Sequence, residues 1–516
     1  MNTYLNISLP PITMFQIKNF HPRPYQVNIS NQAINFNTLA VLPTGLGKTK
    51  LAILTSINRL NNIPNSKILI CAPTKPLSSQ IHKELIDFTD IPEQRISLLT
   101  GTLKPDKRKQ LWDLSFVIIA TPQTIQKDIE NKRISLKDIS LLVLDECHRS
   151  RDNYATTILA DNLIKNSKSP RILALTASPG SSKEKIEQIC KNLFIEKIEI
   201  RTEDDEDLQE FLQKKDITWI NVDLPLEYKE IHKLIGELYK EKLSSLHNFG
   251  LTKPISIINK KDLLSMQFIL RKQIPQNKAA FWGISILSQC IKLNHMLELL
   301  ETQGLIPLKT FIEKLKTETT KASKAILSSA KIQKIELDII NLQQKGIKHP
   351  KINKLKEIIQ EELNKEKNAK IIVFANFRDT VKEITDELNS SNIKAERFVG
   401  QADRSYKGLK QSEQAEILKN FKESKFQVLV ASSVAEEGID INEVKAVIFF
   451  EAVPSELRRV QRMGRTARTK PGKVIFLLTK DTRDEAYYWS ALRKEKKMKS
   501  TLLSMQKEIE KQQTLT

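Results

Sequence analysis

An apolar run that breaks into a glycine-rich turn constrains this chain more than any other feature. Residues 38–42 are largely apolar, and the turn that follows consists of Pro43, Thr44, Gly45, Leu46, Gly47, Lys48 and Thr49. Glycine tolerates turn angles that a side chain resists, so successive backbone N–H groups can point into one concavity at the start of a helix. A lysine and a hydroxyl at the end of such a turn suit outer phosphates and Mg²⁺. The segment predicts a phosphate-binding loop, although Leu42 stands where the motif usually has Gly or Ala.

A second apolar run, residues 139–144, ends in an Asp-Glu-Cys-His sequence at 145–148. Ligands of open α/β sheets lie beyond the carboxyl ends of the strands, so we expect these carboxylates near the bound phosphates. Asp145 is predicted to hold Mg²⁺, and Glu146 to orient and deprotonate the attacking water. An Asp-Glu pair after a strand is by itself an ordinary loop exit. Together with Lys48 it indicates a site for phosphoryl transfer.

A third segment lies near the end of the chain, after an apolar run at 446–450, and it contains Gln461, Arg462, Arg465 and Arg468. The spacing of three predicts that the arginines share one side of a helix. An arginine offered by a second lobe can complete a phosphate site on a first lobe, which is worth on the order of 10³–10⁵ in rate. We select Arg465 and Arg468 for this role.

Taken in order, these segments resemble the motifs of superfamily 2 helicases. Residues 23–26 resemble the upstream adenine-reading motif, 176–178 resemble motif III, and 432–440 resemble motif V. The resemblance implies ATP and Mg²⁺ as cofactors, with the metal held by Thr49 and Asp145. The implied nucleotide-binding residues are Arg23, Gln26, Pro43, Thr44, Gly45, Leu46, Gly47, Lys48, Thr49, Gly438 and Asp440. The implied catalytic residues are Lys48, Asp145, Glu146, Gln461, Arg465 and Arg468.

The same resemblance implies a nucleic-acid track across both lobes. Residues 72–75, 100–101 and 120–123 resemble motifs Ia, Ic and Ib, and residues 372–378 resemble motif IV. The implied contacts are Thr74, Lys75, Gly101 and Thr121 in the first lobe, and Arg378, Gln401 and Ser432 in the second.

The resemblance narrows to the archaeal Hef helicases, whose relatives include the Fanconi anaemia group M translocase and yeast Mph. The segments that carry it are residues 42–49, 72–77, 175–180, 397–401 and 482–489, with 299–305 and 349–359 between the lobes. Cys147 stands where Hef-like proteins often have Ala, and Ala467 where Gly is common. Hef proteins often carry a C-terminal nuclease domain, for which this chain leaves no room before Thr516. We therefore expect the helicase part only, with a separate nuclease or a sliding clamp as a partner.

The charge balance favours a polyanionic partner. The chain has 82 Lys and Arg against 61 Asp and Glu, a net charge of +21. Its 4 cysteines are scattered without a C-x-x-C pair, which argues against a zinc site or a disulfide framework. No apolar run approaches the roughly 20 residues that span a bilayer. We expect a cytoplasmic protein with no membrane partner, associated with the nucleoid in a prokaryote.

The alternation of apolar runs and amphipathic stretches predicts an α/β fold with two tandem RecA-like parallel-sheet lobes and an all-helical, thumb-like insert between them. The expected domains are 1–205 for the ATP-binding lobe, 206–348 for a DNA-binding helical insert, 349–485 for the second lobe and 486–516 for a charged C-terminal helix. That helix is expected to pack on the second lobe or to contact nucleic acid. A strand is expected near 219–222.

These features predict an ATP-dependent DNA helicase or translocase that remodels forked or branched DNA. Two alternatives remain open. The Asp-Glu-Cys-His sequence and the helical insert also resemble the double-stranded-RNA sensors and Dicer helicase domains, which would make duplex RNA the substrate. An ATP-gated scaffold that binds junctions without net turnover is the second, although Lys48, Asp145, Glu146 and Arg465 count against it.

Overall fold

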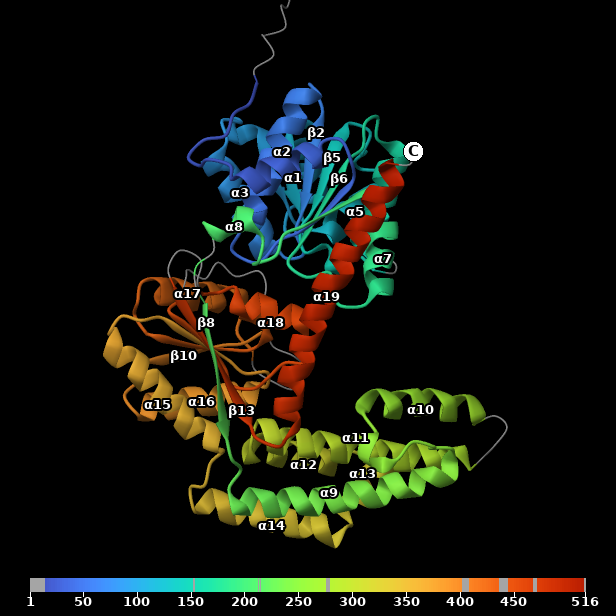
Figure 1. Ribbon diagram of the computed structural model, residues 1–516, viewed down its shortest axis with the longest axis vertical. Helices are drawn as coiled ribbons and strands as arrows, with labels where there is room; N and C mark the ends of the chain where they lie inside the picture. Colours follow the sequence, from blue (N-terminus) through green and yellow to red (C-terminus); the bar gives the residue numbers. More distant parts are fainter. Residues whose placement is uncertain are drawn as a thin grey trace, which may run out of the picture.

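The computed structural model describes residues 14–151, 154–211, 213, 215–274, 279–400, 408–435, 444–466 and 471–514. Two parallel sheets covered by helices form two lobes, and a helical bundle extends from the second (Figure 1). The predicted α/β fold of two parallel-sheet lobes with an all-helical insert is confirmed. Among the described residues, no helix is both long and apolar enough to cross a membrane.

The first lobe is built on a seven-stranded parallel sheet with the order β3-β4-β2-β5-β6-β1-β7. Its strands are β1 (Thr38–Val41), β2 (Lys67–Cys71), β3 (Ile96–Leu99), β4 (Val117–Ala120), β5 (Ile139–Leu144), β6 (Ile172–Thr176) and β7 (Lys197–Ile200). Strands covered on both faces consist of continuous apolar residues, and β1 and β5 are buried along their whole length. Only β6 separates these two strands, so the loops that follow them lie close together.

Helices cover both faces of this sheet. They are α1 (Pro24–Ala33), α2 (Lys48–Asn62), α3 (Lys75–Phe88), α4 (Pro105–Leu114), α5 (Pro122–Glu130), α6 (Ala155–Asn166), α7 (Lys183–Asn192) and the short α8 (Glu206–Gln209). Successive strand residues point to opposite faces. Leu39 therefore joins the core under α6 and α7, whereas Ala40 joins the core under α1 and α2.

The second lobe is a six-stranded parallel sheet with the order β10-β11-β9-β12-β13-β8. Its strands are β8 (Lys215–Val222), β9 (Ile371–Phe374), β10 (Ala395–Phe398), β11 (Val428–Ala431), β12 (Ala446–Phe449) and β13 (Gly472–Thr479). Its helices are α15 (Pro350–Lys365), α16 (Arg378–Ser390), α17 (Gln411–Lys422) and α18 (Glu456–Met463). The expected insert range of 206–348 includes β8, but all eight residues of β8 pair with β13 at the edge of this sheet. The second lobe is therefore made from two separate segments of the chain.

The described part of the insert is a bundle of six α-helices. They are α9 (Leu226–Leu246), α10 (Lys260–Gln273), α11 (Ala280–Thr302), α12 (Leu305–Thr317), α13 (Lys321–Leu327) and α14 (Ala330–Gln344). Polar contacts fix the bundle to the second lobe at the end of α11. The carboxylate of Glu301 accepts from the backbone N–H of Arg483 at 2.9 Å, and its backbone carbonyl accepts from the hydroxyl of Thr479 at 2.8 Å. The insert is thus joined to the second lobe by hydrogen bonds as well as by the chain.

One long helix, α19 (Arg483–Thr514), runs from the second lobe to the first (Figure 1). The predicted helix at 486–516 therefore starts three residues earlier. Its first turns pack on the second lobe, as expected, and Tyr488 lies in the core of that lobe. Its C-terminal half instead packs beside β7, where Met498, Leu502 and Met505 are buried in the core of the first lobe. The sequence did not predict this docking on the first lobe.

Candidate ATP site and nucleic-acid track

The predicted phosphate loop lies between β1 and α2. Gly45 and Gly47 have φ values of +85° and +72°, in the left-handed region that favours glycine. Gly47 is the residue before α2, so the helix begins at Lys48 and its free N–H groups face the loop. Lys48 and Thr49 are half-buried. Backbone donors, an ammonium and a hydroxyl at a helix N-terminus fit a triphosphate and Mg²⁺.

Two residues of α1 fix the phosphate loop through hydrogen bonds to its backbone carbonyls. The side-chain amide of Gln26, which is 1% exposed, donates to the carbonyls of Leu46 and Gly47 at 3.4 and 3.2 Å. The hydroxyl of Tyr25 donates to the carbonyl of Leu46 at 2.7 Å. A Cβ built on Gly47 would lie 2.7 Å from the amide nitrogen of Gln26, so this close approach also requires glycine. The predicted adenine-reading segment is therefore adjacent to the phosphate loop.

Arg23 precedes α1, and its guanidinium lies over the ring of Phe211, 4.4 Å from the ring centroid. Phe211 comes from the segment that connects the two lobes. The sequence-based prediction missed this aromatic residue, because a single phenylalanine outside any motif gives no signal.

The two carboxylates follow β5. The backbone N–H of Asp145 donates to the carbonyl of Cys71 at 2.9 Å, which extends the pairing of β5 with β2 beyond the strand. Glu146 adopts a left-handed conformation with φ +52°, which is unusual for a residue other than glycine. Its backbone N–H donates to the carboxylate of Asp145 at 3.1 Å. The turn thus keeps both carboxylates at the carboxyl end of the sheet, close to the phosphate loop.

The surroundings of Glu146 favour its charged form. Burial alone would raise the pKa of Glu146, but the neighbouring imidazole of His148 and the charges of Lys48 and Arg149 lower it below its usual value. Nδ1 of His148 lies 3.2 Å from a carboxylate oxygen of Glu146 and 3.3 Å from the hydroxyl of Thr176. A carboxylate that stays ionised can accept a proton from water. The histidine connects it to the end of β6.

The third predicted segment differs from its expected form. Helix α18 ends at Met463, so Arg465 does not share a helix face with Arg462. Arg462 is 0% exposed and donates to the side-chain oxygen of Asn376 at 2.6 Å, inside the second lobe. The prediction that these arginines share one helix face is therefore wrong, because α18 ends and a turn begins before Arg465. Thr466 fixes that turn by donating from its hydroxyl to the carbonyl of Val444 at 2.6 Å.

This turn touches the phosphate loop of the other lobe. A Cβ built on Gly464 would lie only 1.8 Å from the hydroxyl oxygen of Thr44. The next residue, Arg465, is 8% exposed, and Gln461 is 4% exposed. The structure therefore brings the arginine turn of the second lobe against the phosphate loop of the first. The predicted residues Arg468, Gly438, Asp440 and Gln401 lie outside the described part of the chain.

The predicted nucleic-acid residues of the first lobe follow three neighbouring strands. Thr74 and Lys75 follow β2, Gly101 follows β3 and Thr121 follows β4. Thr74 and Thr121 are the residues immediately before α3 and α5, and the hydroxyl of Thr121 shares a hydrogen bond with that of Thr124 at 2.8 Å. These strands form the β3-β4-β2 side of the sheet, away from the phosphate loop after β1.

The second lobe repeats this arrangement. Arg378 is the first residue of α16, directly after β9, and Ser432 follows β11 and is 5% exposed. Strands β10, β11 and β9 are neighbours at one side of the second sheet, as β3, β4 and β2 are in the first. The predicted nucleic-acid residues of each lobe, here called a half-track, thus follow equivalent strands of the two sheets.

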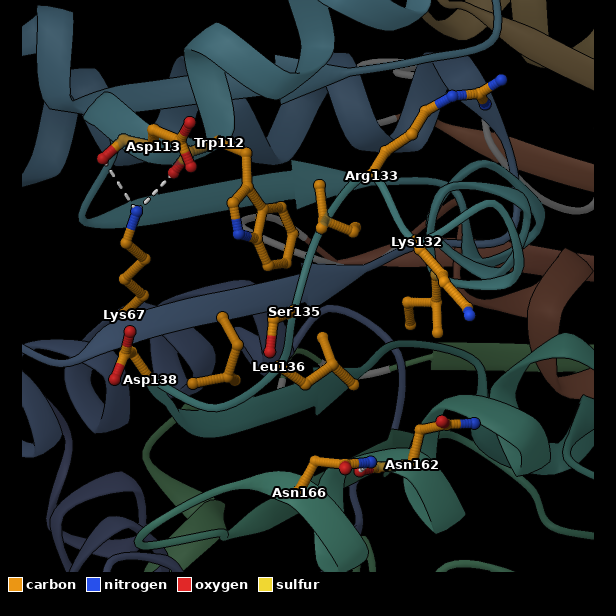
Figure 2. A pocket seen from close by; sticks show the side chains of 13 residues that line it. Lys67, Trp112, Asp113, Lys132, Arg133, Ser135, Leu136, Asp138, Asn162 and Asn166 are labelled. Atoms are coloured by element: carbon orange, nitrogen blue, oxygen red, sulfur yellow. Dashed lines mark hydrogen bonds between the residues drawn. The ribbon is translucent and has the colours of Figure 1, made fainter.

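A separate cavity of about 730 Å³ lies at the opposite end of the first sheet (Figure 2). Lys67 and Ile139, the first residues of β2 and β5, line it together with Trp112 and Arg133. The ammonium of Lys67 donates to the backbone carbonyl of Asp113 at 2.9 Å. The phosphate loop follows the carboxyl end of β1, whereas this cavity lies at the amino ends of β2 and β5 in the same parallel sheet. The cavity is therefore no part of the nucleotide site.

A phosphate loop and two carboxylates on one parallel-sheet lobe, closed by an arginine turn from a second such lobe, define a two-lobed helicase ATPase. Three family models match the chain: "DEAD/DEAH box helicase" over residues 23–186, "Putative ATP-dependent RNA helicase, helical bundle" over 227–346 and "Helicase conserved C-terminal domain" over 350–470. The solved helicase domain of Hef from Pyrococcus furiosus is 43% identical, with a TM-score of 0.70, and the match covers 91% of this chain and 98% of that one. The chain belongs to the Hef family of helicases and is an ATP-hydrolysing enzyme.

Longer relatives align over almost the whole of this chain. A Methanocaldococcus jannaschii protein named "Putative ATP-dependent RNA helicase" is 41% identical over 95% of this chain and 61% of its own length. The "ATP-dependent DNA helicase mph1" of Neurospora crassa is 34% identical over 90% of this chain and 41% of its own length. The chain therefore spans between two fifths and three fifths of the length of these relatives.

Proposed function

We propose that this chain is an ATP-dependent DNA helicase or translocase that remodels forked or branched DNA and works at the chromosome. The contact of Gly464 with Thr44 carries the proposal, because it joins the two lobes at the phosphate loop. A motor needs a nucleotide-dependent change in how its lobes meet. A site shared by two lobes supplies that change.

The site residues are assigned roles from their places. Lys48 and the N–H groups at the start of α2 bind the outer phosphates. Thr49 and Asp145 would hold Mg²⁺, which neutralises phosphate charge and fixes its geometry when bound. Glu146 orients the attacking water and accepts its proton, and the charges of Lys48 and Arg149 favour the ionised form that this role needs. Arg465, aided by Arg468 and Gln461, stabilises the charge that develops on the transferred phosphoryl group.

The remaining assigned residues complete the nucleotide pocket. Arg23 and Gln26 are assigned to binding of the base, and Gly438 and Asp440 to nucleotide binding by the second lobe. Hydrolysis removes the phosphate that draws Arg465 toward Lys48, so the lobes separate. Because the two half-tracks follow equivalent strands of the two sheets, each cycle changes the distance between them. The nucleic acid then moves by one step per ATP.

The helical insert is proposed to bind a duplex arm of the substrate. Exposed basic side chains on and beside α10 include Lys260, Lys261, Arg271 and Lys272, and the chain as a whole carries a net charge of +21. Contacts with phosphates carry no sequence information, so recognition would follow the shape of the DNA. A separate nuclease or sliding clamp is proposed as the protein partner.

Two variants test the phosphate loop. Lys48→Ala should abolish nucleic-acid-stimulated ATP hydrolysis, because it removes the charge that binds the outer phosphates. Lys50→Ala is the matched control: its ammonium lies 5.0 Å from the ring of Phe20 and has no assigned role in the site. Substantial stimulated turnover in Lys48→Ala would contradict the assignment of the phosphate loop.

The substrate is tested by measuring ATPase stimulation with forked DNA, duplex DNA and duplex RNA at two salt concentrations. We expect the strongest stimulation by forked DNA, with a steep loss at higher salt because phosphate binding releases counterions. Preference for duplex RNA would favour the RNA helicase alternative, which the name of the Methanocaldococcus relative supports. Tight junction binding without turnover would indicate a scaffold.

A further inference from the structure

One face of α19 contacts both lobes in turn. Its members recur every three or four residues, which places them on one side of a helix. They are Tyr488, Ala491, Glu495, Met498, Leu502, Met505 and Ile509. Tyr488 packs in the core of the second lobe, whereas Met498, Leu502 and Met505 pack in the core of the first. The change of lobe falls between Glu495 and Met498, less than one helical turn apart.

Met498 contacts the segment that follows β6. The hydroxyl of Ser178, which is fully buried, donates to the sulfur of Met498 at 2.9 Å, and its backbone N–H donates to the hydroxyl of Thr176 at 3.1 Å. The same Thr176 oxygen lies 3.3 Å from Nδ1 of His148, which lies 3.2 Å from the carboxylate of Glu146. Four polar contacts therefore connect α19 with the carboxylate assigned to the attacking water.

Glu495 contacts the helix that delivers the arginine turn. Its carboxylate pairs with the guanidinium of Arg459 in α18, and these side chains are 23% and 5% exposed. Arg459 also lies over the ring of Phe476, 5.4 Å from the centroid, so its position is fixed within the second lobe. Four residues after Arg459, α18 ends, and Gly464 lies against the phosphate loop.

We propose that Met498 and Glu495 are positioning residues for ATP hydrolysis. Helix α19 contacts both α18 and the segment 176–178, so a change in the approach of the arginine turn to the phosphate loop is passed through Met498 to the orientation of His148 and Glu146. The inference rests on the proposed function, because it needs Glu146 to act on the water. Combining substitutions at two of these contacts measures whether the contacts depend on one another.

The test compares steady-state kinetics of full-length variants. Met498→Leu keeps the apolar volume and removes the sulfur that accepts from Ser178. We expect kcat to fall about three- to tenfold, the effect of one lost hydrogen bond, with KM for ATP and Tm almost unchanged. In a Ser178→Ala background the same substitution should lower kcat no further, because the hydrogen bond between Ser178 and Met498 is already absent. Glu495→Gln should also lower kcat without raising KM.

Leu502→Ala is the matched control, one turn further along the same buried face. It should lower Tm through lost packing and leave kcat unchanged at temperatures where the protein stays folded. Wild-type kcat in both Met498→Leu and Glu495→Gln would overturn the inference and leave the proposed function intact. If Met498→Leu lowered kcat equally in the wild-type and Ser178→Ala backgrounds, the hydroxyl of Ser178 would not carry the effect of Met498. A wild type that hydrolyses no ATP would overturn both proposals.

Discussion

Gly464, at the end of a helix in the second lobe, lies directly against Thr44 in the phosphate loop of the first. A Cβ on the glycine would fall 1.8 Å from the threonine hydroxyl oxygen, far inside van der Waals contact. Only a residue without a side chain can occupy that place while the lobes hold these positions. The contact therefore sets how closely Arg465 can approach a bound triphosphate.

Gly464→Ala should keep the lobes from reaching this position. We predict a fall in kcat for ATP hydrolysis of up to about 100-fold, because displacement by about an ångström is enough to misplace a catalytic group. Binding of ATP to the phosphate loop should change much less, so equilibrium binding and turnover measured together separate the two effects.

Gly236→Ala is the control for that substitution. A Cβ on Gly236, in the middle of α9, meets no atom within 4 Å. Alanine in a helix interior is favoured over glycine by roughly 0.5–1 kcal/mol, so this variant should be slightly more stable and equally active. Unchanged turnover in Gly464→Ala would show that the observed contact is not part of the hydrolytic cycle.

Arg465→Ala should retain ATP binding and lose hydrolysis by about two orders of magnitude or more, because the guanidinium is needed only in the transition state. Arg458→Ala, which removes an exposed arginine from α18, the helix that precedes this turn, is the matched comparison. Single-turnover measurements with bound ATP report the chemical step directly. Equal rates for Arg465→Ala and wild type would remove the arginine from the site.

Lys351 and Asp484 form a completely buried ion pair that joins α15 to the start of α19. The carboxylate of Asp484 also accepts from the backbone N–H groups of Ala452 and Thr479, at 2.8 and 3.0 Å. Lys351→Met leaves this charge uncompensated, so we predict a loss of about 3–5 kcal/mol in the free energy of unfolding. Urea denaturation measures this loss. Adding Asp484→Asn to Lys351→Met should recover part of it, and two independent, additive losses would contradict the pairing.

Glu383, in α16, should give the protein a pH-dependent stability. Burial, followed by the charge of Glu387, raises the pKa of Glu383 from its ordinary value of 4.5 to about 7. Between these two values the folded state binds a proton that the unfolded state releases, so the free energy of unfolding falls as pH rises. Glu383→Gln should remove this slope and stabilise the protein by roughly 1–3 kcal/mol at pH 8. Parallel unfolding curves for both proteins from pH 5 to 8 would contradict the assignment.

Most strands of both lobes could be predicted, because parallel strands covered on both faces consist of unbroken apolar residues. Strands β3 and β10, which lie at sheet edges, give a weaker signal. In β10, Glu396 and Arg397 are exposed, so the apolar signal is interrupted. The strand ending at Val222 was expected, but its sheet was not, since local sequence does not reveal which edge accepts a strand.

The phosphate loop and the carboxylates were found because each follows directly on a buried strand. The arginine segment was found, but its geometry was not: spacing alone does not show that α18 ends at Met463. The periodic face of α19 is visible in the sequence, and it could have predicted a buried helix side. That Met498 lies on the first lobe could not be predicted, because periodicity identifies a face and not its partner.

The docking of α19 also has a consequence for synthesis on the ribosome. Met498, Leu502 and Met505 complete the apolar interior of a lobe whose other residues emerge some three hundred positions earlier. The apolar surface of the first lobe that these three residues cover stays exposed to water until almost all of the described chain has been translated. A fragment cut after residue 205 would keep this surface permanently uncovered, and recombinant production of that piece should yield aggregates.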